Sequence, residues 1–198
     1  MNEKIIKLNK ILSSYSNGNK QKAYSDLKKI SLKYPEDQKI NFNLAIMEQD
    51  QGLFNEAKIT YKKLIKKFNN LNAKINLYIL YLKEKDYLSA LDLIELILKI
   101  KPNLKEVLLD KAYALLKLND VIGCMQICNY ILKEQHNNIN AINLIGLSLI
   151  QQKKYIDAEK KLVKGLSINE NNVALLNSLG KLYFEIWDLN KSEKFYLK

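Results

Sequence analysis

The feature that most constrains this chain is a repeating spacing of small residues along its whole length. Each one follows a turn and a polar segment. They are Ala23, Ala57, Ala90, Cys124, Ala158 and Ser192. The spacings are 34, 33, 34, 34 and 34 residues. Pro35 and Pro102 keep this register, because each lies 12 residues after a small residue and ends an apolar run. These regular spacings indicate a tandem repeat.

Each repeat contains two runs with helical periodicity, which the fifth repeat shows clearly. Its first run contains Ile142, Ile145, Gly146 and Leu149, and its second contains Tyr155, Ala158, Leu162, Gly165 and Leu166. Spacings of three and four residues place these side chains on one helical face. We therefore predict that each repeat is a pair of helices joined by a short turn, so that neighbouring pairs must stack to bury a core.

The pattern resembles the tetratricopeptide repeat (TPR) family, whose period is 34 residues. The predicted units are 4–37, 38–70, 71–104, 105–138, 139–172 and an incomplete 173–198, and slot n denotes the nth residue of a unit. The resemblance implies a single all-α domain over 1–198: a right-handed α-solenoid, or superhelix, of stacked antiparallel helix pairs. Slot 8 is small in the family because the paired helices cross closely there. Tyr78 departs from this pattern, and we expect it to splay or shift the third pair.

The two ends of the repeat array differ. In the first unit, Lys7, Lys10 and Ser14 occupy slots that would contact a preceding repeat, so we expect an exposed first helix and a natural start. In the last unit, Leu176 and Tyr183 are as apolar as in an interior repeat, and no polar capping helix follows. This favours an N-terminal piece of a longer protein. The alternative is self-association through the uncapped C-terminal helix.

No constellation of residues predicts catalysis. His136 is the only histidine and occupies a turn, while Cys124 and Cys128 occupy packing slots without further metal ligands. Phosphate-binding, zinc-protease and nucleophile-elbow motifs are absent from the sequence. We expect no enzyme activity, no metal and no cofactor. Two cysteines are too few for a disulfide framework, and no apolar stretch reaches the ~18–20 residues of a membrane span, so we expect a cytoplasmic protein.

The net charge is +11, and all 32 basic residues are lysines. Lysine pairs fall on the second helices, which face outward in this architecture, rather than in a groove. Without arginine, bidentate reading of bases or phosphates is lost. We predict no specific nucleic-acid binding, although weak, salt-sensitive binding of polyanions through the lysine-rich convex face stays open.

The resemblance implies that slots 2, 5, 6, 9, 12 and 13 of the first helices face a concave channel. Slot 6 holds Asn9, Asn43 and Asn76, followed by Asp110. Stacked asparagines could clamp the backbone of an extended peptide, or they could simply be solvated. Slots 5, 9 and 12 are unusually apolar, and with Asn143 they complete the predicted peptide-binding groove. The remaining groove residues are Phe42, Ile46, Ile75, Ile79, Leu82, Leu109, Tyr113, Leu116 and Leu147.

An apolar stripe along an open channel is typical of a binding surface for a helix or an extended apolar segment. Two alternatives stay open: packing between first helices, or occupation of the channel by a continuation of the chain. The lysines and asparagines that clamp acidic chaperone tails in some TPR proteins are missing. We predict a non-catalytic scaffold that binds a protein or peptide. The alternative is the substrate-recruiting arm of a larger enzyme, such as a glycosyltransferase or sulfotransferase.

Overall fold

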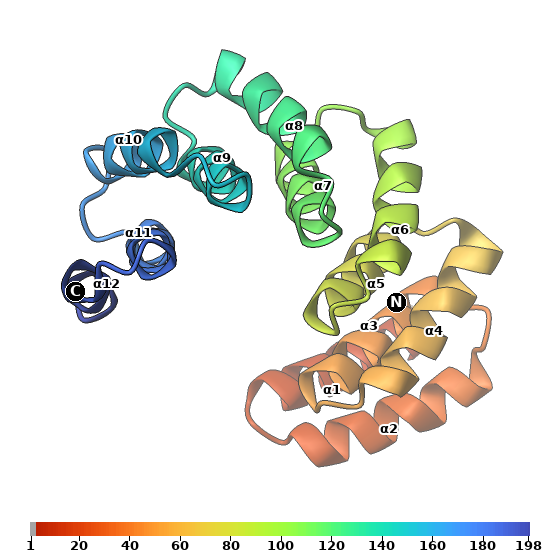
Figure 1. Ribbon diagram of the computed structural model, residues 1–198. Helices are drawn as coiled ribbons and strands as arrows, with labels where there is room; N and C mark the ends of the chain where they lie inside the picture. Colours follow the sequence, from red (N-terminus) through yellow and green to blue (C-terminus); the bar gives the residue numbers. More distant parts are fainter. Residues whose placement is uncertain (1–2) are drawn as a thin grey trace. The chain divides into compact units, whose positions relative to one another are not determined.

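The computed structural model describes residues 3–198, and every regular element in that range is an α-helix (Figure 1). The helices are α1 (Glu3–Ser16), α2 (Lys20–Lys33), α3 (Gln38–Asp50), α4 (Phe54–Phe68), α5 (Leu71–Lys83), α6 (Tyr87–Ile100), α7 (Lys105–Lys117), α8 (Val121–Glu134), α9 (Ile139–Gln151), α10 (Tyr155–Leu166), α11 (Val173–Glu185) and α12 (Leu189–Tyr196). The predicted all-α solenoid of helix pairs is confirmed.

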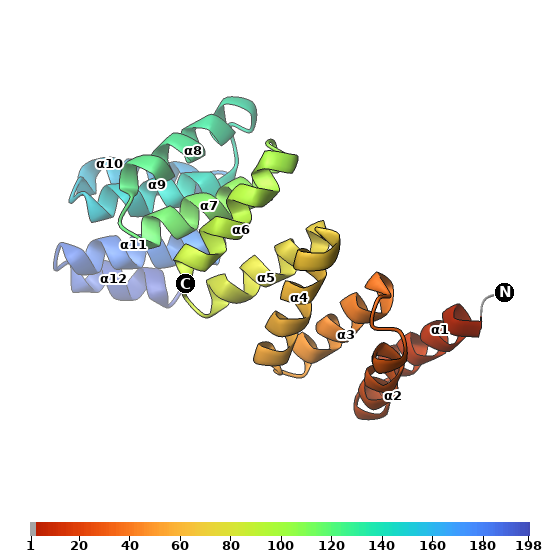
Figure 2. The ribbon, with the colours of Figure 1, turned by 90° about the vertical axis from the view of Figure 1, so that its right-hand side faces the viewer.

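The chain divides into two compact units, residues 1–97 and 98–198. In the first, α2 packs on α3 and α4 packs on α5. In the second, α8 packs on α9 and α10 on α11, while the first helices α7, α9 and α11 contact one another in turn (Figure 2). The second helices α2, α4, α8 and α10 thus each pack on their own first helix and on the first helix of the next pair, which is how a repeat array buries a continuous core.

Asparagine or aspartate fixes the start of most first helices. The side chain of each N-cap accepts a hydrogen bond from the backbone N–H three residues later, which satisfies one of the unpaired donors of a helix start. These caps are Asp37, Asn70, Asn138 and Asn172. Leu104, at the equivalent position before α7, makes no such bond.

The turn inside each pair contains one residue in the left-handed backbone region, always at slot 15. These residues, with their φ angles, are Gly18 (93°), Gly52 (77°), Lys85 (63°), Asn119 (69°), Lys153 (59°) and Trp187 (63°). Only glycine adopts this region without a steric penalty, and asparagine tolerates it better than most residues. The turn geometry is therefore kept in all six pairs, although three of them place a costly residue there.

Slots 8 and 20 set how closely the two helices of a pair approach. All six slot-20 residues are buried, as the resemblance implies. At Gly146 in slot 8, an added Cβ would lie 2.4 Å from a methyl carbon of Leu162. Tyr78 fills the same slot in the third pair and is 2% exposed.

The third pair shares a core although Tyr78 fills its crossing point. Ala90 of α6, at slot 20 of the same pair, is fully buried, and Leu93 of α6 packs against the core that contains Leu77 and Leu80 of α5. That Tyr78 splays or shifts this pair stays a prediction.

Candidate protein-binding surface

The residues predicted to line the groove lie on first helices of both units. In residues 1–97 they are Asn9 on α1, Phe42, Asn43 and Ile46 on α3, and Ile75, Asn76, Ile79 and Leu82 on α5. In residues 98–198 they are Leu109, Asp110, Tyr113 and Leu116 on α7, and Asn143 and Leu147 on α9. Each unit therefore presents its own set.

The apolar members are half-buried rather than fully exposed, apart from the buried Leu116. The ring centroid of Phe42 lies 6.1 Å from that of Tyr61, at a tilted angle. In the second unit, Leu109, Tyr113 and Leu147 pack against the core around Ala112 and Cys128. Core contacts hold one side of these side chains while the other side stays accessible.

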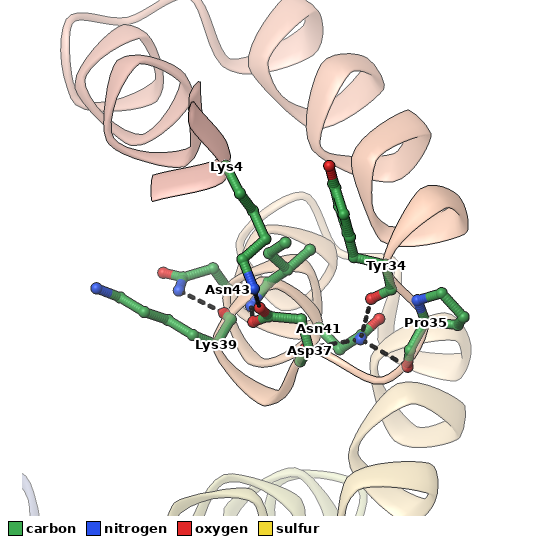
Figure 3. Close-up of polar contacts among 8 residues, drawn as sticks. Lys4, Tyr34, Pro35, Asp37, Lys39, Asn41 and Asn43 are labelled. Atoms are coloured by element: carbon green, nitrogen blue, oxygen red, sulfur yellow. Dashed lines mark hydrogen bonds and ion pairs between the residues drawn. The ribbon is translucent and has the colours of Figure 1, made fainter. Parts of the chain in front are cut away.

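Two of the three asparagines of the predicted ladder donate hydrogen bonds within the chain. Asn43 Nδ2 donates to the backbone oxygen of Lys39 on its own helix at 2.7 Å (Figure 3). Asn76 Nδ2 donates to the Tyr61 hydroxyl at 3.0 Å, and that hydroxyl donates to Gln49 Oε1 at 3.3 Å. Asn9 is exposed. Asn43 and Asn76 thus each use one of their two amide N–H groups within the chain.

Tyr61 anchors this polar network and is fully buried on α4. Burial raises the pKa of its phenol to about 12, and the Asn76 hydrogen bond offsets only part of that increase. The hydroxyl therefore stays neutral at physiological pH and can both accept and donate. The slot pattern placed Tyr61 in the core but gave no signal of this bond to Asn76.

The turn before α3 positions Phe42 and Asn43. Asn41 Nδ2 donates to the backbone oxygens of Tyr34, Pro35 and Asp37 at 3.4, 3.1 and 2.8 Å (Figure 3). The Asp37 carboxylate accepts from Ile40 N–H and pairs with Lys4 of α1. Burial works against the charged carboxylate, but these partners outweigh it and lower the pKa of Asp37.

In the second unit, Ser178 Oγ of α11 donates to Asn143 Oδ1 of α9 at 2.6 Å. This bond joins slot 5 of one repeat to slot 6 of the next. It links two first helices on the surface where the resemblance implies a channel.

Glu48 is a buried carboxylate that the sequence pattern missed. It occupies slot 11 of α3 and is 4% exposed, and Thr60 Oγ1 donates to it at 2.9 Å. Burial raises its pKa, because the Thr60 bond and the charges of Lys28 and Lys63 offset only part of the desolvation. An acidic residue where the family prefers tyrosine was the available signal.

The side chains considered for catalysis are dispersed. Cys124 and Cys128 are free and buried, and the hydrogen bond between them together with burial raises the pKa of Cys128. His136 is exposed, with Nδ1 2.8 Å from the backbone oxygen of Leu132. Within residues 3–198, no group of three or more His, Cys, Asp or Glu side chains could hold a metal ion. In the same range, no helix is both long and apolar enough to cross a bilayer.

Stacked helix pairs with half-buried apolar rows define an α-helical repeat solenoid. Within that class, the chain has the tetratricopeptide-repeat fold. No protein-family model matches the sequence, and a search of curated proteins finds no match.

Similar solved structures support the assignment to the tetratricopeptide-repeat fold. A tetratricopeptide repeat protein from Parabacteroides merdae ATCC 43184 aligns with a TM-score of 0.89 at 19% identity, over 97% of this chain and 77% of that one. MamA 41-end from Desulfovibrio magneticus RS-1 gives 0.76 at 15% identity, over 87% and 98%. PilW, a type IV pilus biogenesis factor, gives 0.73 at 12% identity, over 98% and 91%. At these identities the likeness concerns the fold.

Proposed function

We propose that this chain is a non-catalytic scaffold that binds a protein partner, as a peptide or a helix, on the apolar rows of its first helices. The observation that carries the proposal is the row of half-buried Phe42, Ile46, Ile75, Ile79 and Leu82 on α3 and α5. Phe42 packs against the core that contains Tyr61, and the other four side chains are half-buried, so less conformational entropy is lost when a partner covers them than for fully exposed side chains.

This row offers mainly apolar contacts and has few polar groups that could select one partner over another. Asn43 and Asn76 lie beside it, but each already donates one amide N–H within the chain. An apolar helix face is the partner that suits such a surface, because a helix satisfies its own backbone hydrogen bonds and contributes side chains at i, i+3, i+4 and i+7. Clamping of an extended backbone by asparagines is the less favoured mode.

The test is the double variant Phe42→Lys with Ile79→Lys, used as bait for crosslinking and mass spectrometry in cell extract. We expect it to lose proteins that the unmodified chain captures, while helical circular dichroism persists. The matched control is Ile59→Lys with Leu88→Lys, which adds the same charge at exposed apolar residues of second helices. Equal capture by both double variants would contradict the proposal.

The lysine content supports a second, weaker candidate, which is polyanion binding. Lys62, Lys66, Lys153, Lys154 and Lys160 are exposed, mostly on second helices. Titration with heparin should then show binding at low salt that is largely lost at physiological salt, because released counterions drive such binding. Affinity that survives physiological salt would instead favour a specific polyanion site.

A further inference from the structure

A crevice recurs at the same repeat slots of the first three pairs, all within residues 1–97. It lies between the first and second helix of a pair, on the side that faces the preceding pair. The three cavities measure about 440 Å³ in the first pair, about 350 Å³ in the second and about 300 Å³ in the third. Because the slots are equivalent, differences in charge among the three crevices indicate which kind of helix each can contact.

In the second and third pairs, the second helix of the preceding pair forms one wall of the crevice. For the second pair that wall is Lys28, Ser31 and Leu32 of α2. For the third pair it is Lys62, Ile65 and Lys66 of α4. In both cases the helix that faces the crevice is amphipathic and presents aliphatic side chains and lysines to it.

The pairs that receive these helices supply acidic residues to the same crevices. Glu48 and Glu56, together with Lys63, line the second crevice opposite α2, and Asp92 lines the third opposite α4. Within each crevice a basic helix therefore faces a wall with more acidic than basic side chains. The arrangement follows ordinary charge complementarity.

In the first pair, the residues that the pair supplies to its crevice are mainly basic instead of acidic. Its crevice is lined by Lys7, Lys10, Lys22 and Lys29, with Asp26 as the one acidic member. The floor is apolar and is formed by Ile11, Ala23 and Ile30. Among the described residues, α1 and α2 alone line this crevice.

We propose that this first crevice docks an acidic amphipathic helix of a partner protein. The apolar side of the helix would cover the floor, and its carboxylates would meet the four lysines. The equivalent crevices show that helices fit this geometry, and the reversed charge specifies an acidic one. The lysine-rich second helices of another copy of this chain would be repelled. The surface is separate from the first-helix rows, so the two proposals stand independently.

Two synthetic stapled helices of about 14 residues, close in length to the helices that line these crevices, provide the direct test. Both carry leucine at i, i+3, i+4 and i+7, and the flanking positions are glutamate in one and lysine in the other. Fluorescence anisotropy with the full chain should show at least tenfold tighter binding of the glutamate peptide, weakening as salt rises. No saturable binding of that peptide, or equal binding of both, would overturn the proposal.

Charge-reversal variants test whether the peptide binds in the first crevice. The variant Lys10→Glu with Lys29→Glu should weaken the glutamate peptide by about tenfold or more and improve the lysine peptide. The matched control, Lys160→Glu with Lys164→Glu on α10, changes the net charge equally at exposed lysines and should bind like the unmodified chain. Circular dichroism verifies that both fold. An equal loss in the two variants would mean that net charge alone attracts the peptide, and the crevice assignment would fall.

Discussion

The third and fifth helix pairs have side chains of very different size at the point where their two helices cross. At slot 8, where paired helices cross, the fifth pair has Gly146 against the side chain of Leu162, and the third has the buried ring of Tyr78. The fifth pair is close-packed at its crossing, whereas the third must accommodate a buried ring there. We expect the volume of this single side chain to set the spacing of a helix pair. Substitutions at equivalent slots can test this relation.

The largest effect is expected from Tyr78→Ala. Removing a buried ring leaves a cavity, and we expect a loss of about 3 kcal/mol in unfolding free energy, measured by urea denaturation with circular dichroism. If α5 and α6 closed onto the smaller residue, the loss would be much smaller and amide exchange along α6 would slow. That outcome would mean that the volume of the Tyr78 ring sets the spacing of this pair.

The converse change is Gly146→Leu, which puts a large side chain into the narrow crossing. Its Cβ alone would lie within 2.4 Å of Leu162, so we expect overpacking to cost about 2 kcal/mol despite the better helix propensity of leucine. Gly146→Ala is the graded control and should cost less, because the Leu162 side chain can rotate. If the leucine variant were as stable as the unmodified chain, slot 8 would not control the spacing.

Slot 11 offers a third comparison, between Glu48 in the second pair and Leu149 in the fifth. Burial raises the folded-state pKa of Glu48 above its unfolded value, so the carboxylate destabilises the fold as pH rises through this range. Glu48→Gln keeps an oxygen for Thr60 and should add on the order of 1 kcal/mol at pH 7. The gain should vanish near pH 3, where both side chains are neutral. A gain independent of pH would exclude the charge as its cause.

The smallest effect concerns slot 15. Lys153→Gly should stabilise the chain by about 0.5–1 kcal/mol, because glycine adopts the positive φ without steric cost. Gly52→Ala, at the equivalent turn, should destabilise it by a similar amount. Thermal unfolding curves of the two variants should shift in opposite directions. Shifts in the same direction would mean that contacts of the lysine side chain outweigh the backbone term.

Periodicity predicted the fold class because the repeats carry small and apolar residues at the same slots. The polar details could not be predicted in this way. The bond from Asn76 to Tyr61 depends on how two helices from different repeats face each other. The first crevice likewise depends on Lys22 and Lys29 of α2 lying beside Lys7 and Lys10 of α1, a proximity that slot assignments describe only once the helices are packed.

The alkylation rate of the two buried cysteines of α8 can report how often this chain opens. A thiol reacts with an alkylating reagent only when it becomes accessible and loses its proton, and neither occurs readily for Cys128 in the closed fold. Labelling rates would therefore count transient exposures of α8 without any added probe. A repeat array can fray from one end or open as a whole. The dependence of the labelling rate on urea distinguishes these modes, because a local opening exposes little new surface and a global one exposes much.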